Sequence, residues 1–157
     1  MCLVAEDLGI ITPEVNALRA KFKLPGMKIL HFAFGGGDDN YYLPANIEAN
    51  SVVYTGTHDN DTTRGWWQRA PARERAFAGA YLACHDGDAH WGMIRAASNS
   101  VARLALFPLQ DVLGLDGAHR MNLPGTLGPA NWSWRFTWPM LGRDTARTLG
   151  KIGRAHV

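Results

Sequence analysis

Residues 51–61, Ser-Val-Val-Tyr-Thr-Gly-Thr-His-Asp-Asn-Asp, decide the fold class of this chain. Residues 51–57 are rich in Val, Tyr and Thr, which is typical of a β-strand. In the polar residues that follow, Asn60 or Asp61 can cap a short helix that runs through Gln68. A short strand that leads through a polar loop into a helix is typical of α/β proteins.

Apolar stretches on both sides of this segment predict the rest of the fold. Strands are expected over 1–5, 27–34 and 104–106, and helices over 73–84, 88–101 and 145–149. Long connections between short apolar strands favour parallel pairing. Four parallel strands with helical connections form either half of a (β/α)8 barrel or a small open α/β sheet.

One further helix has a clear start. Thr12 fits the N-cap position, and Pro13 fits the first helical position. Val15, Leu18 and Phe22 then fall on one face, so the segment is expected to be an amphipathic helix.

Length and composition exclude several classes of protein. The chain has 157 residues, which is enough for one domain but fewer than the roughly 250 of a complete (β/α)8 barrel. A net charge of +2 gives no reason to expect nucleic acid as a partner. No apolar run reaches the roughly 20 residues of a membrane span, and the N-terminus does not resemble a signal peptide. Two cysteines provide no disulfide framework, so a soluble cytoplasmic protein without a membrane partner is expected.

Two polar segments directly follow predicted strands. They are Ala5-Glu6-Asp7-Leu8-Gly9 and residues 55–61. Catalytic groups collect at the carboxyl ends of parallel strands, and a pair of carboxylates is what glycosidic-bond chemistry requires. The same acidic residues could instead cap the helices that follow, and spacing alone slightly favours capping.

Other site types receive little support. His58, Asp59 and Asp61 could bind a metal, but the remaining histidines show no ligand spacing, so no metal is expected. Residues 35–37 are three glycines without the Gly-Lys-Ser/Thr ending of a phosphate loop, and no cofactor is expected. The cluster Asn-Trp-Ser-Trp-Arg at 131–135 is either a core segment or a set of sugar-stacking platforms, and composition does not decide between them.

Several long motifs occur in a fixed order along the chain. They lie at residues 5–15, 24–28, 31–34, 54–63, 65–67, 108–111, 121–122, 124–126 and 131–135. In order and spacing, from residue 3 to about 149, they resemble the 4-α-glucanotransferases (amylomaltases or disproportionating enzymes) of glycoside hydrolase family 77. The resemblance implies the C-terminal part of a (β/α)8 barrel, with about four parallel strands corresponding roughly to the fifth to eighth.

The resemblance also implies an activity and its residues. These enzymes transfer a segment of an α-1,4-glucan donor to the 4-hydroxyl of glucose or a maltooligosaccharide, with retention of configuration. Glu6 matches the general acid/base, and Asp59 matches the carboxylate that stabilises the transition state. His58 is expected to bind the same sugar. Further glucan contacts are expected from Asp7, Phe32 and Asn131.

One part of the family pattern has no match here. The nucleophile of these enzymes is an Asp in an Arg-x-Asp-His-type strand end upstream of the acid/base. We therefore expect residues 1–150 to be the C-terminal half of a truncated catalytic barrel that is inactive alone. Residues 152–157 can be encoded by a string that resembles a sequencing-library adapter, so 151–157 are expected to be a non-native tail. The alternatives are a non-catalytic glucan-binding remnant and a retaining α-glucan hydrolase.

Overall fold

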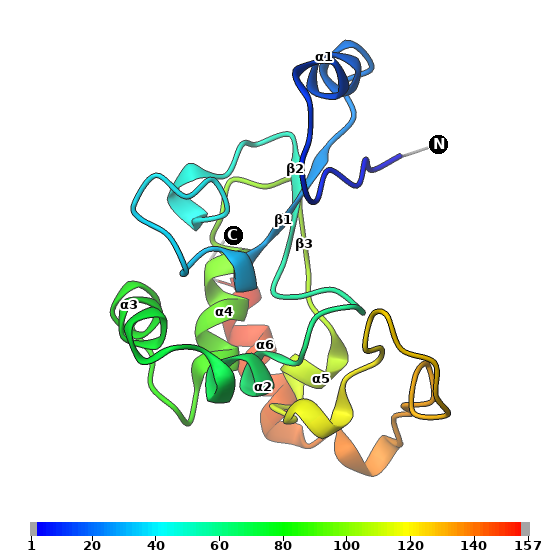
Figure 1. The fold of residues 1–157 in the computed structure, drawn as a ribbon. Helices are drawn as coiled ribbons and strands as arrows, with labels where there is room; N and C mark the ends of the chain where they lie inside the picture. The colour runs from blue at the N-terminus through cyan, green and yellow to red at the C-terminus, as the bar shows by residue number, and fades with distance from the viewer. Residues whose placement is uncertain (1–2, 155–157) are drawn as a thin grey trace.

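A parallel three-stranded sheet forms the centre of the computed structural model, which describes residues 3–154 (Figure 1). The strands are β1 (Gly26–Ile29), β2 (Ser51–Tyr54) and β3 (Leu104–Leu106), in the order β1-β2-β3. Ile29 aligns with Tyr54, and Tyr54 aligns with Leu106, so the three strands end at one edge. The predicted α/β class with parallel strands is confirmed, and the described residues form a three-stranded sheet and not a closed barrel.

Helices of two kinds connect and follow the strands. The α-helices are α1 (Pro13–Lys21), α2 (Thr63–Arg69), α3 (Ala72–Leu82), α4 (Ala89–Ser98), α5 (Leu109–Val112) and α6 (Arg143–Arg154). The 3-10 turns are η1 (Leu30–Phe32), η2 (Pro44–Asn46), η3 (Gly117–His119) and η4 (Trp138–Met140). Figure 1 shows that α2 to α6 gather at one end of the molecule while α1 stands apart at the other. Within residues 3–154, no helix is both long and apolar enough to cross a membrane.

The strand predicted over residues 1–5 is wrong for residues 3–5, and residues 1–2 lie outside the described part. The segment makes one backbone hydrogen bond toward β1, from Ala5 N to Pro25 O at 2.9 Å. The next donor on that side, Met27 N, is taken by the Asp7 carboxylate at 2.6 Å. A side chain therefore replaces the backbone acceptor that would continue the ladder, and the expected four strands become three.

Two predicted boundaries are also wrong. The strand expected over 27–34 ends at Ile29. Leu30, in a 3-10 turn, and Phe34, in the bend after it, are then both buried in the core. An apolar run alone does not distinguish these two conformations. The cap of α2 is Thr62, whose hydroxyl accepts a hydrogen bond from Gly65 N at 3.1 Å, and not Asn60 or Asp61.

The main core lies between one face of the sheet and helices α2 to α4. Val53 of β2 packs there with side chains from the loops and helices: Leu30, Phe34, Leu43, Trp67, Leu82 and Met93. On α1, Thr12 is the N-cap as predicted, but the apolar face of Val15, Leu18 and Phe22 remains exposed. This face therefore adds nothing to the core that the structure describes.

A second, smaller core includes the end of the described chain. Ile94 of α4, Val112 of α5 and Ile152 of α6 form this cluster, and Ile152 is 8% exposed. The helix predicted over 145–149 is thus longer at both ends. That residues 151–157 are non-native stays a prediction, but their described part, 151–154, completes the last turn of α6.

Candidate active site

A cavity of about 810 Å³ opens at the carboxyl ends of the strands. Its walls come from the segment after residue 5 and from the ends of all three strands: Glu6, Leu8, Gly9, Met27, Phe32, Tyr54, Gly56, Thr57, His58, Asp59, Asn60, Leu106, Phe107 and Pro108. Four of the six predicted site residues line it together, namely Glu6, Phe32, His58 and Asp59. The volume lies within the range of roughly 300–1,000 Å³ that is usual for small-molecule sites.

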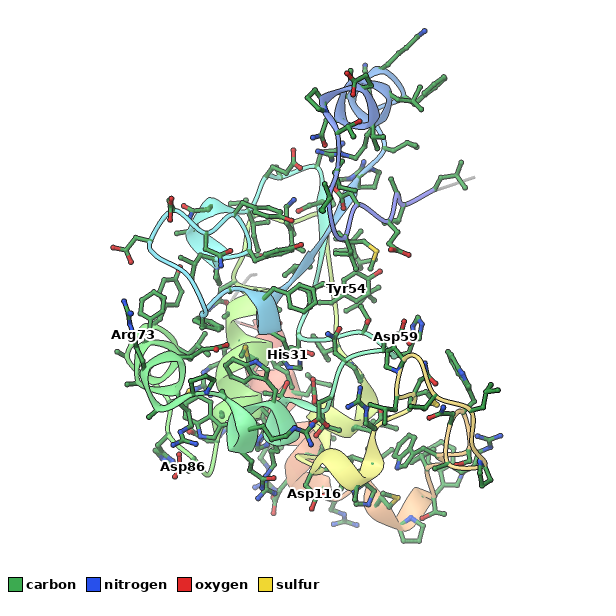
Figure 2. All side chains as sticks on the ribbon, in the orientation of Figure 1. His31, Tyr54, Asp59, Arg73, Asp86 and Asp116 are labelled. Carbon is green, nitrogen blue, oxygen red and sulfur yellow. The ribbon has the colours of Figure 1, made fainter. Side chains whose placement is uncertain are left out.

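Strand direction explains why residues so far apart in sequence meet here. Parallel strands carry their carboxyl ends to the same edge of a sheet, and the loops that follow share that edge. Tyr54 and Leu106 align in the sheet and give the cavity an apolar wall. Figure 2 shows Asp59 in the loop beyond the strand that carries Tyr54.

Asp59 is held by contacts from a distant loop. Its Oδ1 accepts a hydrogen bond from Asn122 Nδ2 at 2.7 Å, and its backbone carbonyl accepts one from Arg120 at 2.9 Å. His58 Nε2 lies 3.4 Å from the same carboxylate oxygen. The side chains of His58 and Asp59 are still about half exposed, at 56% and 49%. The carboxylate is therefore fixed in direction while remaining open to a ligand.

The turn that presents His58 and Asp59 is stabilised by Asn60. Its Oδ1 accepts hydrogen bonds from the backbone N–H and the hydroxyl of Thr57, both at 2.8 Å. The N–H of Asn60 donates back to the carbonyl of Thr57 at 3.1 Å. Asn60 therefore closes a tight turn instead of capping α2.

Trp132 brings the aromatic motif at 131–135 to the site. Its ring lies beside that of His58, with centroids 5.0 Å apart, and it is 55% exposed. Its backbone has φ +61°, an uncommon conformation for a residue other than glycine. Of the two interpretations of this motif, an exposed platform fits Trp132.

Two predicted site residues lie elsewhere. Asp7 is buried at 7% exposure, where it bonds Met27 N and lies 3.5 Å from Arg19 Nε. Asn131 bridges its own loop, because it accepts from Leu123 N at 3.0 Å and donates to the carbonyl of Thr126 at 3.0 Å. Neither residue lines the cavity, so both act on the loops around it.

The sequence indicated no role for Asn122 or Arg120 and left Trp132 open between a core residue and a sugar platform, although all three reach the His58–Asp59 pair. Asn122 was recognised only as part of a motif, and Trp132 only as part of an aromatic cluster. A loop rich in Gly and Pro has no periodicity from which its neighbours could be derived. Membership in a motif was the one available signal for Asn122 and Trp132, and Arg120 lies in no recognised motif.

Gly56 is the position in the site least tolerant of a side chain. A Cβ there would lie 2.7 Å from His31 Cε1, and the His31 ring cannot retreat because it stacks on Trp66 with a centroid distance of 5.4 Å. Gly56→Ala is expected to destabilise the fold by about 1–3 kcal/mol, as overpacked substitutions do. Thermal unfolding should show a melting temperature lower by roughly 3–10 °C. Gly128→Ala is the control, since a Cβ at Gly128 meets nothing within 4 Å; an equal effect of both substitutions would contradict the packing argument.

Metal chemistry has no evident centre in the part of the chain that the structure describes. Residues 3–154 contain no group of three or more His, Cys, Asp or Glu side chains placed to hold a metal ion. The ionisable side chains that line the cavity are the carboxylates of Glu6 and Asp59, the imidazole of His58 and the phenol of Tyr54.

Comparisons with known proteins show which family the chain resembles. A family model described as 4-alpha-glucanotransferase matches residues 1–141. The 4-alpha-glucanotransferase of Synechocystis sp. is 57% identical over 136 residues, covering 85% of this chain and 27% of that protein. The 4-alpha-glucanotransferase of Thermus thermophilus is 51% identical over 142 residues, covering 85% and 28%. A solved amylomaltase from Streptococcus agalactiae in complex with acarbose matches with a TM-score of 0.92 and 30% identity, over 98% of this chain and 31% of that one. The chain therefore spans less than a third of the length of these relatives.

Proposed function

Because the chain belongs to the 4-α-glucanotransferase family, glycoside hydrolase family 77, we propose that it supplies the acid/base side of a glucan-transferring active site. The reaction moves a segment of an α-1,4-glucan to the 4-hydroxyl of glucose or a maltooligosaccharide. One observation carries the proposal: Glu6, from the segment beside β1, and Asp59, from the loop that follows β2, line a single cavity.

Glu6 is the general acid and base. In the first step it protonates the glycosidic oxygen as the bond to the leaving sugar breaks. In the second step it removes the proton from the attacking 4-hydroxyl of the acceptor. Its exposed position on the cavity wall gives both sugars access to it.

Asp59 stabilises the positive charge that develops on the donor sugar. A carboxylate held by Asn122 and His58 has little freedom to reorient during the reaction, which is the condition for electrostatic stabilisation. His58 binds the same sugar, and Phe32 contributes an apolar wall. Asp7 and Asn131 do not line the cavity. They support the site indirectly, because each accepts a backbone hydrogen bond that fixes a segment beside it, from Met27 and Leu123 respectively.

Retention of configuration needs a third carboxylate as the nucleophile. No aspartate of residues 1–157 matches the family pattern for that role. We therefore place the nucleophile in a segment outside this sequence, which the chain must be joined to or assembled with for turnover. A cytoplasmic setting belongs to the same proposal.

A chimera tests this function directly. In it, the chain replaces the matching segment of the Thermus thermophilus relative, which is 51% identical. With maltotriose, the chimera is expected to release glucose and form maltopentaose, whereas the chain alone is expected to form neither. Chromatography of the products separates the alternatives.

Each outcome has a distinct meaning. Equal amounts of glucose and maltose without longer products indicate a hydrolase, because water has replaced the sugar acceptor. Binding of maltotriose without products in a folded chimera indicates a non-catalytic glucan-binding module. Turnover by the chain alone would contradict the external nucleophile.

A further inference from the structure

A fully buried carboxylate lies beneath the loop that carries His58 and Asp59. Asp111, on α5, is 1% exposed. It accepts three hydrogen bonds, from Thr55 Oγ1 at 2.6 Å, from Thr63 Oγ1 at 2.8 Å and from Thr63 N at 2.7 Å. Hydrogen bonds to a charged acceptor are about twice as strong as neutral ones, and burial keeps water from competing for them.

The residues that donate these hydrogen bonds stand at the two ends of the segment that carries His58 and Asp59. Thr55 directly follows β2, and Thr63 is the first residue of α2. One carboxylate therefore clamps both ends of the segment between them, which we call the 55–63 loop. The exposed His58–Asp59 pair lies in the middle of that loop.

His31 extends the clamp to a third element. Its Nε2 lies 3.0 Å from the Thr63 hydroxyl oxygen. That hydroxyl has one proton, which goes to Asp111 because a carboxylate cannot donate. His31 Nε2 must therefore be the donor, and the order of donation is His31 to Thr63 to Asp111.

The surroundings of the His31 side chain keep its imidazole ring neutral. Its ring stacks on Trp66 with an interplanar angle of 2°. Burial lowers the pKa of His31 to about 4, although the Asp111 carboxylate opposes this shift. The ring is thus neutral near pH 7, and its backbone N–H also bonds the carbonyl of Thr55 at 3.2 Å.

We propose that Asp111 is a positioning residue that acts through Thr55 and Thr63 to hold Asp59 where the reaction needs it. The inference rests on the proposed function of Asp59. Asp111 does not line the cavity, and its route to the reaction is the backbone of the 55–63 loop. Displacement of a reacting group by about 1 Å can reduce the rate about 100-fold.

Thr63 offers the sharpest substitution. Thr63→Val preserves the shape and the N–H but removes the hydroxyl, so Asp111 loses one donor and His31 loses its acceptor. Thr63→Ser keeps the hydroxyl. In the chimera, Thr63→Val is expected to lower kcat by about 10–100-fold with KM changed less than about threefold, and Thr63→Ser is expected to retain most of kcat.

A control addresses general loss of stability. Asp86 accepts a hydrogen bond from Trp67 Nε1 at 2.7 Å, and Figure 2 shows it far from Asp59. Asp86→Ala removes this acceptor, so it should lower the melting temperature without changing kcat at temperatures where the protein is folded. If Thr63→Val behaves like Asp86→Ala, or if Thr63→Ser loses as much kcat as Thr63→Val, the positioning role is wrong.

Amide exchange gives a readout that does not depend on activity. The Thr57 and Asn60 amides are hydrogen-bonded within the turn, so their exchange should become about tenfold faster in Thr63→Val and not in Thr63→Ser. If the unsubstituted chimera shows no transfer, the proposed function fails while this measurement still tests the clamp. Unchanged exchange in Thr63→Val would show that the clamp does not hold the loop.

Discussion

Glu6→Gln in the chimera is expected to lower the rate of transfer from maltotriose by about 10³-fold, because the amide can neither protonate the leaving oxygen nor deprotonate the acceptor. Glutamine has nearly the same size and shape, and Glu6 is exposed on the cavity wall, so the fold and the binding of maltooligosaccharides should remain. Initial rates and calorimetric binding measure the two properties separately.

A donor with a better leaving group sharpens this test. Fluoride departs without protonation, so the first-turnover burst of fluoride from maltosyl fluoride should occur in the Glu6→Gln protein at a rate much closer to that of the unsubstituted chimera. Later turnovers should stay slow, because the acceptor hydroxyl still lacks its base. Glu14→Gln is the matched control, since Glu14 is an exposed carboxylate on α1 that does not line the cavity. A near-normal transfer rate in Glu6→Gln would remove Glu6 from the acid/base role.

Asp59→Asn is expected to lower the rate of transfer by about 10²–10³-fold, because a neutral amide stabilises developing positive charge less than a carboxylate does. The side-chain oxygen of asparagine can still accept the hydrogen bond from Asn122 Nδ2, so the loop should keep its geometry. The expected loss of rate therefore comes from the missing negative charge at residue 59 and not from a displaced side chain.

The fluoride donor distinguishes this role from that of Glu6. Charge develops on the sugar whichever group leaves, so the first-turnover release of fluoride should remain slow in Asp59→Asn, whereas it recovers in Glu6→Gln. Asp116→Asn is the control, because Asp116 is also an exposed carboxylate beside a histidine, 3.1 Å from His119 Nδ1. Recovery of Asp59→Asn with the fluoride donor would contradict charge stabilisation.

Elements that depend on local sequence were predicted well. The Thr12–Pro13 start of α1 is confirmed because the fixed φ of proline favours the first helical position, although the Thr12 side chain makes no capping hydrogen bond. The strand at 104–106 is found at those residues. The strand expected at 1–5 failed for residues 3–5 because the Asp7 side chain, and not the backbone, takes the next hydrogen bond from β1.

For the candidate site, the strand pattern predicts which residues meet, whereas their chemical roles come from another source. Glu6, Phe32, His58 and Asp59 meet because parallel strands end at a common edge, a rule that needs only the strand pattern. The chemical roles given to them came from motif resemblance and stay predictions until the substitutions above are measured.

What only the tertiary structure decided are the contacts between distant segments. Asn122 reaches Asp59 across 63 positions, and Asp111 reaches Thr55 across 56. Asp7, expected at the glucan, instead lies buried against β1. The sequence by itself determined the α/β class and the edge at which the reactive groups gather, because periodicity and chain direction are local properties. Which side chain then points at which partner depends on how separate segments pack, and a hydrogen bond between distant residues leaves no periodic pattern in either of them.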